Sequence, residues 1–471
     1  MRPLARFPPV GGIRSGVPTL KTWHACGLLG VGVFTAYVAS PVRVQSDSIW
    51  SIPTAASILH RGDSNLDEFQ PTFAAITKHG VADAGGHFYY GYPMGAVIAA
   101  LPLLAPADAL VGWATPLLEH LGKLGALFLK WRTVFHQEGL IELGALGRTE
   151  NLVASFYVAL AVVVVFLTAR HRAGLGLGAA LAAALLFAFG TSAYSTSSRV
   201  LWQHTPSILA TACLVYGITR PRQSARSAAA IGFALAAAYS CRPTNAISVA
   251  AVLCYFPLRW RSPALLGSLL LGAVPVAVVF CGYNESVFGS LLSPYFAQHW
   301  DPFRWEVIPA FAAQFVSPSR GLLVFSPVLA WSGWEIFKRV RQRALTPEET
   351  TFVAILGLHG LAVSSYACWW AGHSIGPRFW TDVLPYFLWF LMPAVGRAWD
   401  RTARASAFRP AFWIAAGLSI LIHVHASTSY DVHAWNDGPP NVDQAPSRVW
   451  DWRDPQLLRG INRWLLDGRL L

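Results

Sequence analysis

One carboxylate, Asp47, stands alone among small and aromatic residues just beyond a strongly apolar run, in the stretch VRVQSDSIWSIP (residues 42–53). A carboxylate in this position can take a proton from an attacking hydroxyl group and so act as a general base. The same group could instead cap a short helix that begins near Ile49, together with Ser46 or Ser48. We favour the catalytic role, which a capping role does not exclude.

A second pair of acids, Asp67 and Glu68, lies in the stretch RGDSNLDEF (residues 61–69). Either acid could be the base in place of Asp47. All three carboxylates could instead hold a divalent cation, because hard cations bind several oxygen ligands. A solvated turn explains the pair at least as well, since Gly and polar residues come directly before it. The sequence leaves the metal requirement open.

Arginine residues recur where the chain returns from one apolar run to the next, often beside Trp, Tyr or His. An arginine forks two hydrogen bonds onto a phosphate and stays charged at any working pH. The strongest candidate is Arg378 in GPRF, where Gly376 and Pro377 fix the backbone. The other candidate phosphate ligands are Arg320, Arg242, Arg199, Arg148 and His204. For any single one of them, anchoring at a membrane interface or capping a helix is an equally good explanation.

Aromatic residues accompany these arginines and offer flat apolar faces to sugar rings, with a polar tip at the edge. The candidates for a sugar or acceptor site are Tyr89, Tyr90, Tyr92, Trp202, Trp369, Trp370 and His373. The belts of Trp and Tyr at membrane interfaces are the alternative explanation for most of them. Taken together, the arginines, aromatic residues and carboxylates suit a phosphorylated sugar.

The composition indicates which elements must position these side chains. The 471 residues are 54% hydrophobic and only 13% charged, whereas about 25% charge is usual in soluble domains. We therefore predict an all-α polytopic membrane protein with about eleven transmembrane helices. The apolar runs that predict these spans lie at about 23–41, 151–169, 173–193, 204–219, 228–240, 246–258, 263–283, 321–337, 351–368, 380–396 and 410–428.

A twelfth apolar run, residues 93–118, contains four prolines and Asp108 in its middle. We interpret it as a juxtamembrane or re-entrant segment, because the prolines interrupt helix hydrogen bonding. If this run crossed the membrane, the sidedness of every later loop would be inverted.

The placement of positive charge predicts the orientation. With a cytoplasmic N-terminus and eleven spans, the short inner segments hold more than half of the 36 Lys and Arg residues and few of the 24 Asp and Glu residues. The net charge of +12 is then an orientation signal, and no nucleic acid is expected as a partner, since no basic stripe interleaved with aromatic residues occurs.

The predicted organisation has three parts. Residues 1–22 form a cytoplasmic tail, residues 23–428 a transmembrane domain whose first external loop covers 42–150, and residues 429–471 an external tail. The segment PQLLRGINRWLLDGRLL in that tail has apolar residues at helical spacing, which predicts a helix lying along the membrane surface.

The order of these features resembles the GT-C glycosyltransferases, a superfamily of polytopic enzymes. SDSIWSIP opens the external loop, YYGYPMGAVIAALPLLAP resembles a Tyr- and Pro-rich juxtamembrane element, and GRTEN precedes the predicted second span. The stretches LWQHTP, CRPTN, SPSRGLL, WWAGHSIGPRFW and WDWRDPQLLRG are similar to stretches in bacterial members related to the protein mannosyltransferases and aminoarabinose transferases. The resemblance covers most of the chain in order.

This resemblance implies transfer of a sugar from a polyprenyl-phosphate donor, with inversion at C1, on the external face of the inner membrane. The acceptor would be a lipid, a glycan or a protein, and Asp47 would be the base. Some members require a divalent cation such as Mg or Mn and others none, so no cofactor is certain. A lipid or glycan acceptor is favoured, because members with a soluble outer domain carry it where this chain has only a short tail.

Two other functions remain open from the sequence. A transporter or flippase of lipid-linked sugars would show similar chemistry at its rim, but it needs polar residues along a path through the membrane, and these are sparse here. A non-catalytic membrane subunit of an envelope assembly complex would share the fold without the reaction.

Overall fold

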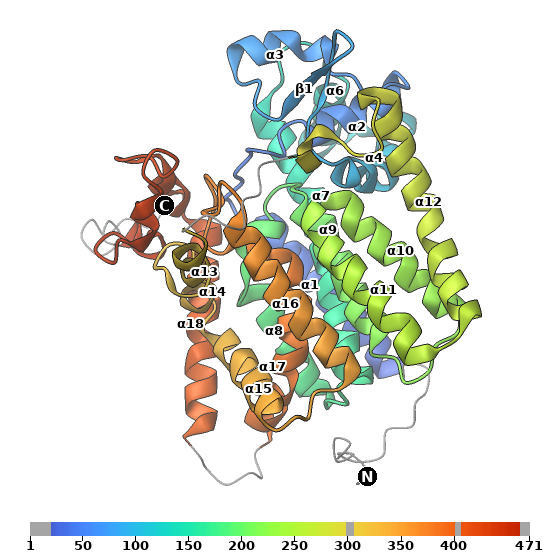
Figure 1. Ribbon diagram of the computed structural model, residues 1–471. Coiled ribbons are helices and arrows are strands. Elements are labelled where there is room, and N and C mark those ends of the chain that lie inside the picture. Colours follow the sequence, from blue (N-terminus) through green and yellow to red (C-terminus); the bar gives the residue numbers. More distant parts are fainter. Residues whose placement is uncertain (1–19, 298–305, 401–406, 462–471) are drawn as a thin grey trace.

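The computed structural model describes residues 20–297, 306–400 and 407–461, and these residues form an almost entirely helical protein (Figure 1). Among these described residues, five helices are long and apolar enough to cross a membrane. They are α1 (Leu20–Ala39), α4 (Gly95–Trp113), α7 (Leu143–His171), α12 (Pro263–Phe288) and α18 (Phe408–Thr428). The prediction of an all-α polytopic membrane protein is confirmed.

The shorter helices complete the bundle. They are α8 (Leu177–Phe189), α9 (His204–Ile218), α10 (Ala225–Cys241), α11 (Ala246–Trp260), α13 (Val307–Val316), α16 (Pro347–Ser365) and α17 (Leu384–Trp399). Every apolar run predicted to span the membrane is helical here, but the run 321–337 is broken into α14 (Leu322–Phe325), a 3-10 turn and α15 (Ala330–Arg341). The break has a local cause: Ser326 leaves the helical region at φ −126 and ψ 69, as residues before a proline do.

The second predicted span also begins earlier than expected. Helix α7 starts at Leu143, so the stretch GRTEN lies inside the helix rather than before it. The reason is burial of its polar residues: Glu150 and Asn151 are 0% and 1% exposed and find partners within the protein. A buried and satisfied carboxylate does not mark a helix end.

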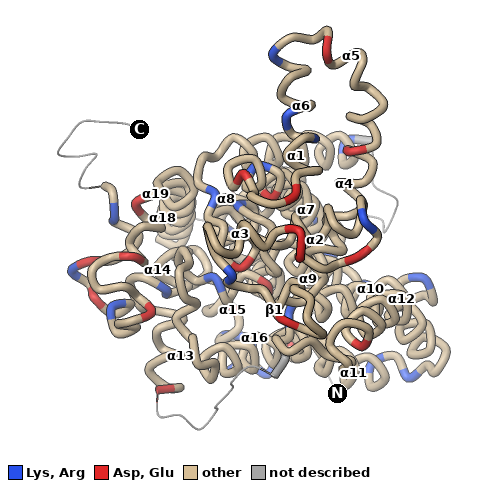
Figure 2. Tube along the Cα trace, turned by 90° about the horizontal axis from the view of Figure 1, so that it is seen from above, with Lys and Arg blue, Asp and Glu red and all other residues tan. Residues whose placement is uncertain are grey.

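The external elements predicted for residues 42–150 gather at the upper end of the molecule in Figure 1. They are α2 (Ser51–His60), α3 (Gln70–Ala75), α5 (Thr115–His120), α6 (Gly122–Phe135) and the antiparallel hairpin of β1 (Val81–Ala84) and β2 (His87–Tyr90), in which Val81 is opposite Tyr90. Figure 2 shows that α5 and α6 project from the edge of the bundle when it is viewed from above. The turns between α11 and α12 and between α15 and α16 lie at the opposite end (Figure 1).

Helix α4 covers most of the apolar run 93–118, with Pro102 and Pro106 inside it. By length and composition it suits a membrane span, whereas the sequence interpretation placed this run beside the membrane. Its neighbours in the structure are α2, α6, α9 and α10. The juxtamembrane placement therefore stays a prediction.

Small residues allow α10 and α12 to cross in direct backbone contact. A Cβ atom on Gly232 would lie 1.8 Å from the carbonyl oxygen of Leu269, and one on Gly272 would lie 2.0 Å from that of Ala229. No side chain fits at either position. Such close crossings are typical of helices packed within a membrane, where van der Waals contact replaces the hydrophobic effect.

The C-terminal tail packs on the bundle. It consists of α19 (Tyr430–Ala434) followed by 3-10 segments, and its Trp435 and Gln456 are completely buried. A 3-10 turn forms at Gln456–Leu458, Ile461 is helical, and residues 462–471 lie outside the described residues, so the predicted surface helix stays a prediction. The predicted cytoplasmic tail likewise falls mostly outside them, in residues 1–19.

Candidate functional site

Asp47 lies in the turn between α1 and α2 and forms an ion pair with Arg378, which is 331 residues away in the chain. The other oxygen of the carboxylate accepts a hydrogen bond from Nε2 of His79 at 3.2 Å. The hydroxyl group of Tyr90 donates to the main-chain oxygen of Asp47 at 3.1 Å, and that of Tyr92 lies 3.1 Å from His79 Nε2. The side chains of Asp47 and Arg378 are only 18% and 10% exposed. The structure thus brings the predicted base and the predicted phosphate ligand into direct contact.

Arg378 is held in place by the backbone before it and by two aromatic groups. Gly376 has φ +55, and a Cβ atom there would lie 2.6 Å from the ring of Phe325, so only glycine fits. Nε of Arg378 donates to Nε2 of His204 at 3.2 Å, and the guanidinium lies 4.0 Å over the ring of Trp202. Within the described chain, Nη1 of Arg378 makes no hydrogen bond. The Nη1 N–H groups of Arg378 are therefore available to donate hydrogen bonds to a further anionic partner.

His204, Arg242 and Asp382 form a second buried group that adjoins Arg378. Nδ1 of His204 lies 2.9 Å and Nε of Arg242 lies 2.8 Å from the same oxygen of Asp382. Nη1 of Arg242 lies 3.2 Å from Nε2 of His204. Because two guanidinium groups face Nε2, that nitrogen accepts and Nδ1 carries the proton, so the imidazole is neutral. We call these residues, with Asp47, His79 and Arg378, the Asp47 cluster.

The protonation states in the turn that carries Asp47 follow from this geometry. Burial by itself would raise the pKa of Asp47, but the Arg378 guanidinium and the hydrogen bond from His79 outweigh it and hold this pKa well below its usual range. The hydrogen bond to Asp47 in turn raises the pKa of His79. In this arrangement Asp47 is an anion held by Arg378, and it is a weak base for as long as that ion pair persists.

A small pocket opens beside Arg242. Its lining includes Thr244, Tyr295, Tyr366 and Phe379. The hydroxyl group of Thr244 is buried and has no hydrogen-bond partner in the described part of the chain. The ring of Tyr295 lies 5.0 Å from that of Tyr92, which connects the pocket to Asp47 through His79. Polar groups without partners are suited to a polar ligand.

Three of the predicted phosphate ligands are not part of this cluster. Arg320 donates all five of its N–H groups to neutral oxygens, those of Trp370, Ser319, Gln456, Gly372 and Asn436. Arg199 donates to the main-chain oxygens of Tyr37, Ser40 and Tyr194 and to the Ser198 hydroxyl. Both arginines therefore donate their hydrogen bonds within the protein and hold neighbouring loops together. Arg148 is exposed on α7, where it lines an apolar groove.

The two other predicted acids also have partners of their own. Asp67 accepts from the Phe88 main-chain N–H at 2.9 Å and lies 2.5 Å from Nδ1 of His87, so it holds strand β2. Glu68 binds the Ser57 hydroxyl and lies 2.6 Å from Arg61, so it holds the end of α2. Among the described residues, neither acid joins Asp47 in a group that could hold a metal ion. The structure does not bring these three carboxylates together, and their binding of Mg or Mn stays a prediction.

The predicted sugar-binding residues fall into two sets. Tyr90, Tyr92 and Trp202 contact the Asp47 cluster, and Tyr89 lies nearby in β2 with its ring 6.3 Å from that of Phe288. Trp369, Trp370 and His373 instead bind the C-terminal tail. Trp369 packs with Trp435 in a small core, the indole of Trp370 donates to Asp443 at 2.7 Å, and His373 lies 3.2 Å from Asp437.

Sequence reasoning missed three residues that shape the site. Asp382 follows Arg378 by four residues, one helical turn, and that spacing was a usable signal. Glu150, inside the stretch GRTEN, accepts from the Gln45 side chain at 2.6 Å and from the Leu201 main-chain N–H at 3.1 Å, so it ties the Asp47 turn to the Trp202 loop. His79 stands in an unremarkable loop, and nothing in the sequence singles it out.

The tail also reaches the site. The side-chain oxygen of Gln456 accepts hydrogen bonds from Arg320 at 2.8 Å and from the main-chain N–H of Gly376 at 2.9 Å. Its amide nitrogen donates to the main-chain oxygens of Ser374 and Val432. A residue near the end of the chain thus fixes the backbone two positions before Arg378.

No protein family model and no curated protein matches this chain. Among solved structures, ArnT from Cupriavidus metallidurans bound to undecaprenyl phosphate is similar, with a TM-score of 0.48 and 12% identity over 89% of this chain and 66% of that one. The archaeal oligosaccharyltransferase AglB from Archaeoglobus fulgidus, in complex with an inhibitory peptide and a dolichol-phosphate, is also similar, with a TM-score of 0.44 and 14% identity over 94% of this chain and 61% of that one. This chain therefore spans just under two thirds of the length of each. Both are members of the GT-C superfamily that the sequence motifs resemble.

Proposed function

We propose that this protein is a membrane glycosyltransferase that transfers a sugar from a polyprenyl-phosphate donor, with Asp47 as the base and Arg378 and Arg242 as ligands of the donor phosphate. The observation that carries the proposal is the buried ion pair of Asp47 with an arginine that keeps free N–H groups. An aromatic face, a neutral imidazole and a small polar pocket adjoin this pair. These are the groups that a phosphorylated sugar requires.

The ion pair supplies a way to switch the base on. A donor phosphate that binds Arg378 competes with Asp47 for the guanidinium, because both are anions that accept from the same N–H groups. Opposite unit charges 4 Å apart attract by roughly 4 kcal/mol at an effective dielectric constant of 20. Loss of even part of this attraction raises the affinity of Asp47 for a proton. Donor binding would therefore convert a weak base into an effective one.

The freed carboxylate would then take the proton from the acceptor hydroxyl as that oxygen attacks C1 of the sugar, with inversion. The bond from C1 to the phosphate oxygen breaks, and the phosphate leaves as an anion that Arg378 and Arg242 stabilise. Because such a leaving group needs little protonation, one carboxylate is sufficient, whereas inverting glycosidases use two. Asp382 would keep Arg242 in position, and Trp202 would keep Arg378 in position.

The proposal includes a location. The Asp47 cluster belongs to the loops that charge placement assigns to the external side, so we assign the reaction to the periplasmic face of the inner membrane. The donor lipid would approach within the bilayer, and the acceptor, whether lipid, glycan or protein, from the external side.

The test is transfer of labelled sugar from polyprenyl phosphate in proteoliposomes that contain the purified protein. We expect Asp47→Asn to lower the transfer rate by about 1,000-fold or more while the protein still binds donor lipid. Asp83→Asn, an exposed acid on β1, is the matched control and should transfer at the normal rate. Full activity of Asp47→Asn with an inactive Asp67 or Glu68 variant would move the base, and lipid scrambling without any sugar transfer would overturn the proposal.

A further inference from the structure

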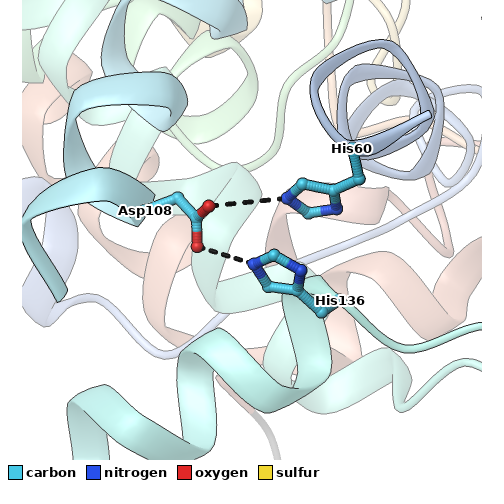
Figure 3. Close-up of side chains that lie close together, drawn as sticks. All are labelled: His60, Asp108 and His136. Carbon is cyan, nitrogen blue, oxygen red and sulfur yellow. Dashed lines mark hydrogen bonds and ion pairs between the residues drawn. The ribbon is translucent and has the colours of Figure 1, made fainter. Parts of the chain in front are cut away.

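Three side chains from separate elements of the chain converge on one another (Figure 3). His60 ends α2, Asp108 lies in α4, and His136 directly follows α6. Nε2 of His136 lies 2.8 Å from one oxygen of Asp108, and Nε2 of His60 lies 3.6 Å from the other. One potential ligand atom from each residue lies within 4.8 Å of the others. Figure 3 shows both imidazole rings directed at the same carboxylate.

We propose that His60, Asp108 and His136 bind a zinc ion. Two imidazole nitrogens and one carboxylate oxygen form a ligand set that zinc accepts, with a fourth position left for water. Imidazole ligands argue against Mg²⁺ and Ca²⁺, which prefer oxygen. The site is separate from the Asp47 cluster and does not depend on the proposed glycosyltransferase reaction.

Groups around the three ligands are arranged to hold them. Nε of Arg132 donates to one oxygen of Asp108 at 3.1 Å, which orients the carboxylate and leaves its other oxygen directed toward His60. Arg132 can approach because Gly112 has no side chain: a Cβ atom there would lie 3.1 Å from Nη2 of Arg132. Hydrogen bonds of this kind to a ligating carboxylate are a regular feature of metal sites.

The inner side of the group is apolar. The ring of Phe135 meets that of His60 edge-on at 4.9 Å, and Trp131 stacks on Phe135 at 5.3 Å. The two imidazole rings stack on each other at 3.6 Å. Both Nε2 atoms face Asp108, and one ring must turn out of the stack to direct its in-plane lone pair at a shared metal ion. The apolar layer covers one side of the ligands, and His60 and His136 are exposed on the other.

A zinc ion here would fasten α2, α4 and the end of α6 to one another. Helix α2 begins immediately after the turn that holds Asp47, and α4 packs on α2. The metal would therefore act as a structural clip that stabilises the external elements, and metal removal would loosen them without touching the Asp47 cluster.

The experiment uses full-length protein purified in detergent by a tag without histidine, stripped with EDTA and titrated with zinc against a chromophoric chelator. We expect one zinc ion per chain with micromolar or tighter affinity, and a higher melting temperature with zinc. His60→Ala, Asp108→Asn and His136→Ala should each weaken binding by about 100-fold. His87→Ala is the matched control, since His87 pairs with Asp67 without a third ligand, and it should bind zinc normally.

Binding of cobalt to the wild-type protein tests the proposal without depending on whether the variants fold. The stripped wild-type protein should bind one Co²⁺ with the intense visible absorption of a tetrahedral site that contains nitrogen ligands. Absence of this absorption, no zinc bound at micromolar concentration, or three folded variants that bind zinc like the wild type would overturn the proposal.

Discussion

Two buried arginines, Arg378 and Arg320, occupy surroundings of opposite character. Arg320 donates every N–H group to a neutral main-chain or amide oxygen, so its partners are all parts of the fold. Arg378 faces a carboxylate, an imidazole nitrogen and an indole ring, and it retains donors. An arginine whose N–H groups all donate to protein oxygens is a structural element. An arginine that pairs with a single acid can exchange that acid for another anion. We infer function from the second kind only.

Among the variants that test this contrast between the two arginines, the largest expected effect is that of Arg378→Lys. Lysine keeps the charge but loses the planar fork that binds phosphate and the face that packs on Trp202, so we expect sugar transfer to fall by about 1,000-fold, or roughly 4 kcal/mol in the barrier. The melting temperature should change by only a few degrees. Initial rates in proteoliposomes measure the loss, with Arg453→Lys, an exposed tail residue, as control. A normal rate in Arg378→Lys would remove this arginine from the site.

Arg320→Met should lower stability more than the transfer rate, the opposite of what we expect for Arg378→Lys. It leaves several buried acceptors without donors, each worth about 1 kcal/mol or more, so we expect a loss of about 3–4 kcal/mol in stability and a melting temperature lower by about 5 °C. Thermal unfolding in detergent measures the melting temperature. We also expect faster proteolysis of the C-terminal tail in this variant. If the folded fraction of this variant lost transfer as completely as Arg378→Lys does, the contrast between the two arginines would be false.

Asp382→Asn tests whether Arg242 belongs with Arg378 or with Arg320. Removal of the acid leaves the buried Arg242 without its ion-pair partner, which costs on the order of 3 kcal/mol. The double variant Asp382→Asn with Arg242→Gln should regain part of that stability but no transfer activity. Stability and rate measured on all four proteins of this cycle give the answer, since recovery of both would make Arg242 purely structural.

The smallest effect concerns His79. Its raised pKa means that its bond to Asp47 stabilises the folded protein fully below the ordinary histidine pKa of about 6.5, and that this contribution is lost as the pH rises through the higher folded-state value. The melting temperature of the wild type should therefore fall by about a degree more than that of His79→Ala between pH 6 and pH 8, since an exposed pair contributes less than about 1 kcal/mol. If the melting temperatures of the two proteins changed equally between pH 6 and pH 8, the pair of His79 and Asp47 would not form.

Much of the fold could be predicted because long apolar runs form helices, although only five helices among the described residues reach the length of a membrane span. The boundaries failed where polar residues are buried, as at Glu150 in α7, or where the backbone is broken locally, as at Ser326. Neither event leaves a mark in hydropathy, because each depends on partners far away in the sequence or on a single proline.

The candidate site could be predicted only in part, for a similar reason. Asp47, Arg378, Arg242 and His204 stand at the ends of apolar runs, and folding brings these ends together. Arg199 and Arg320 stand at equivalent places, and they differ only in how many main-chain oxygens surround them in the folded protein. The number of main-chain oxygens around an arginine depends on the tertiary structure, so the sequence does not reveal it. The same holds for the His60, Asp108 and His136 group, whose members come from three distant segments.

The bond from Gln456 to the main chain of Gly376 has a consequence for biosynthesis. Residue 456 is synthesised after the described helices of the bundle, so the loop that carries Arg378 lacks this hydrogen bond until that residue has been made. A nascent chain that stops early would insert its helices yet hold this arginine loosely. Full positioning of the Arg378 loop would thus follow insertion of the bundle helices into the membrane.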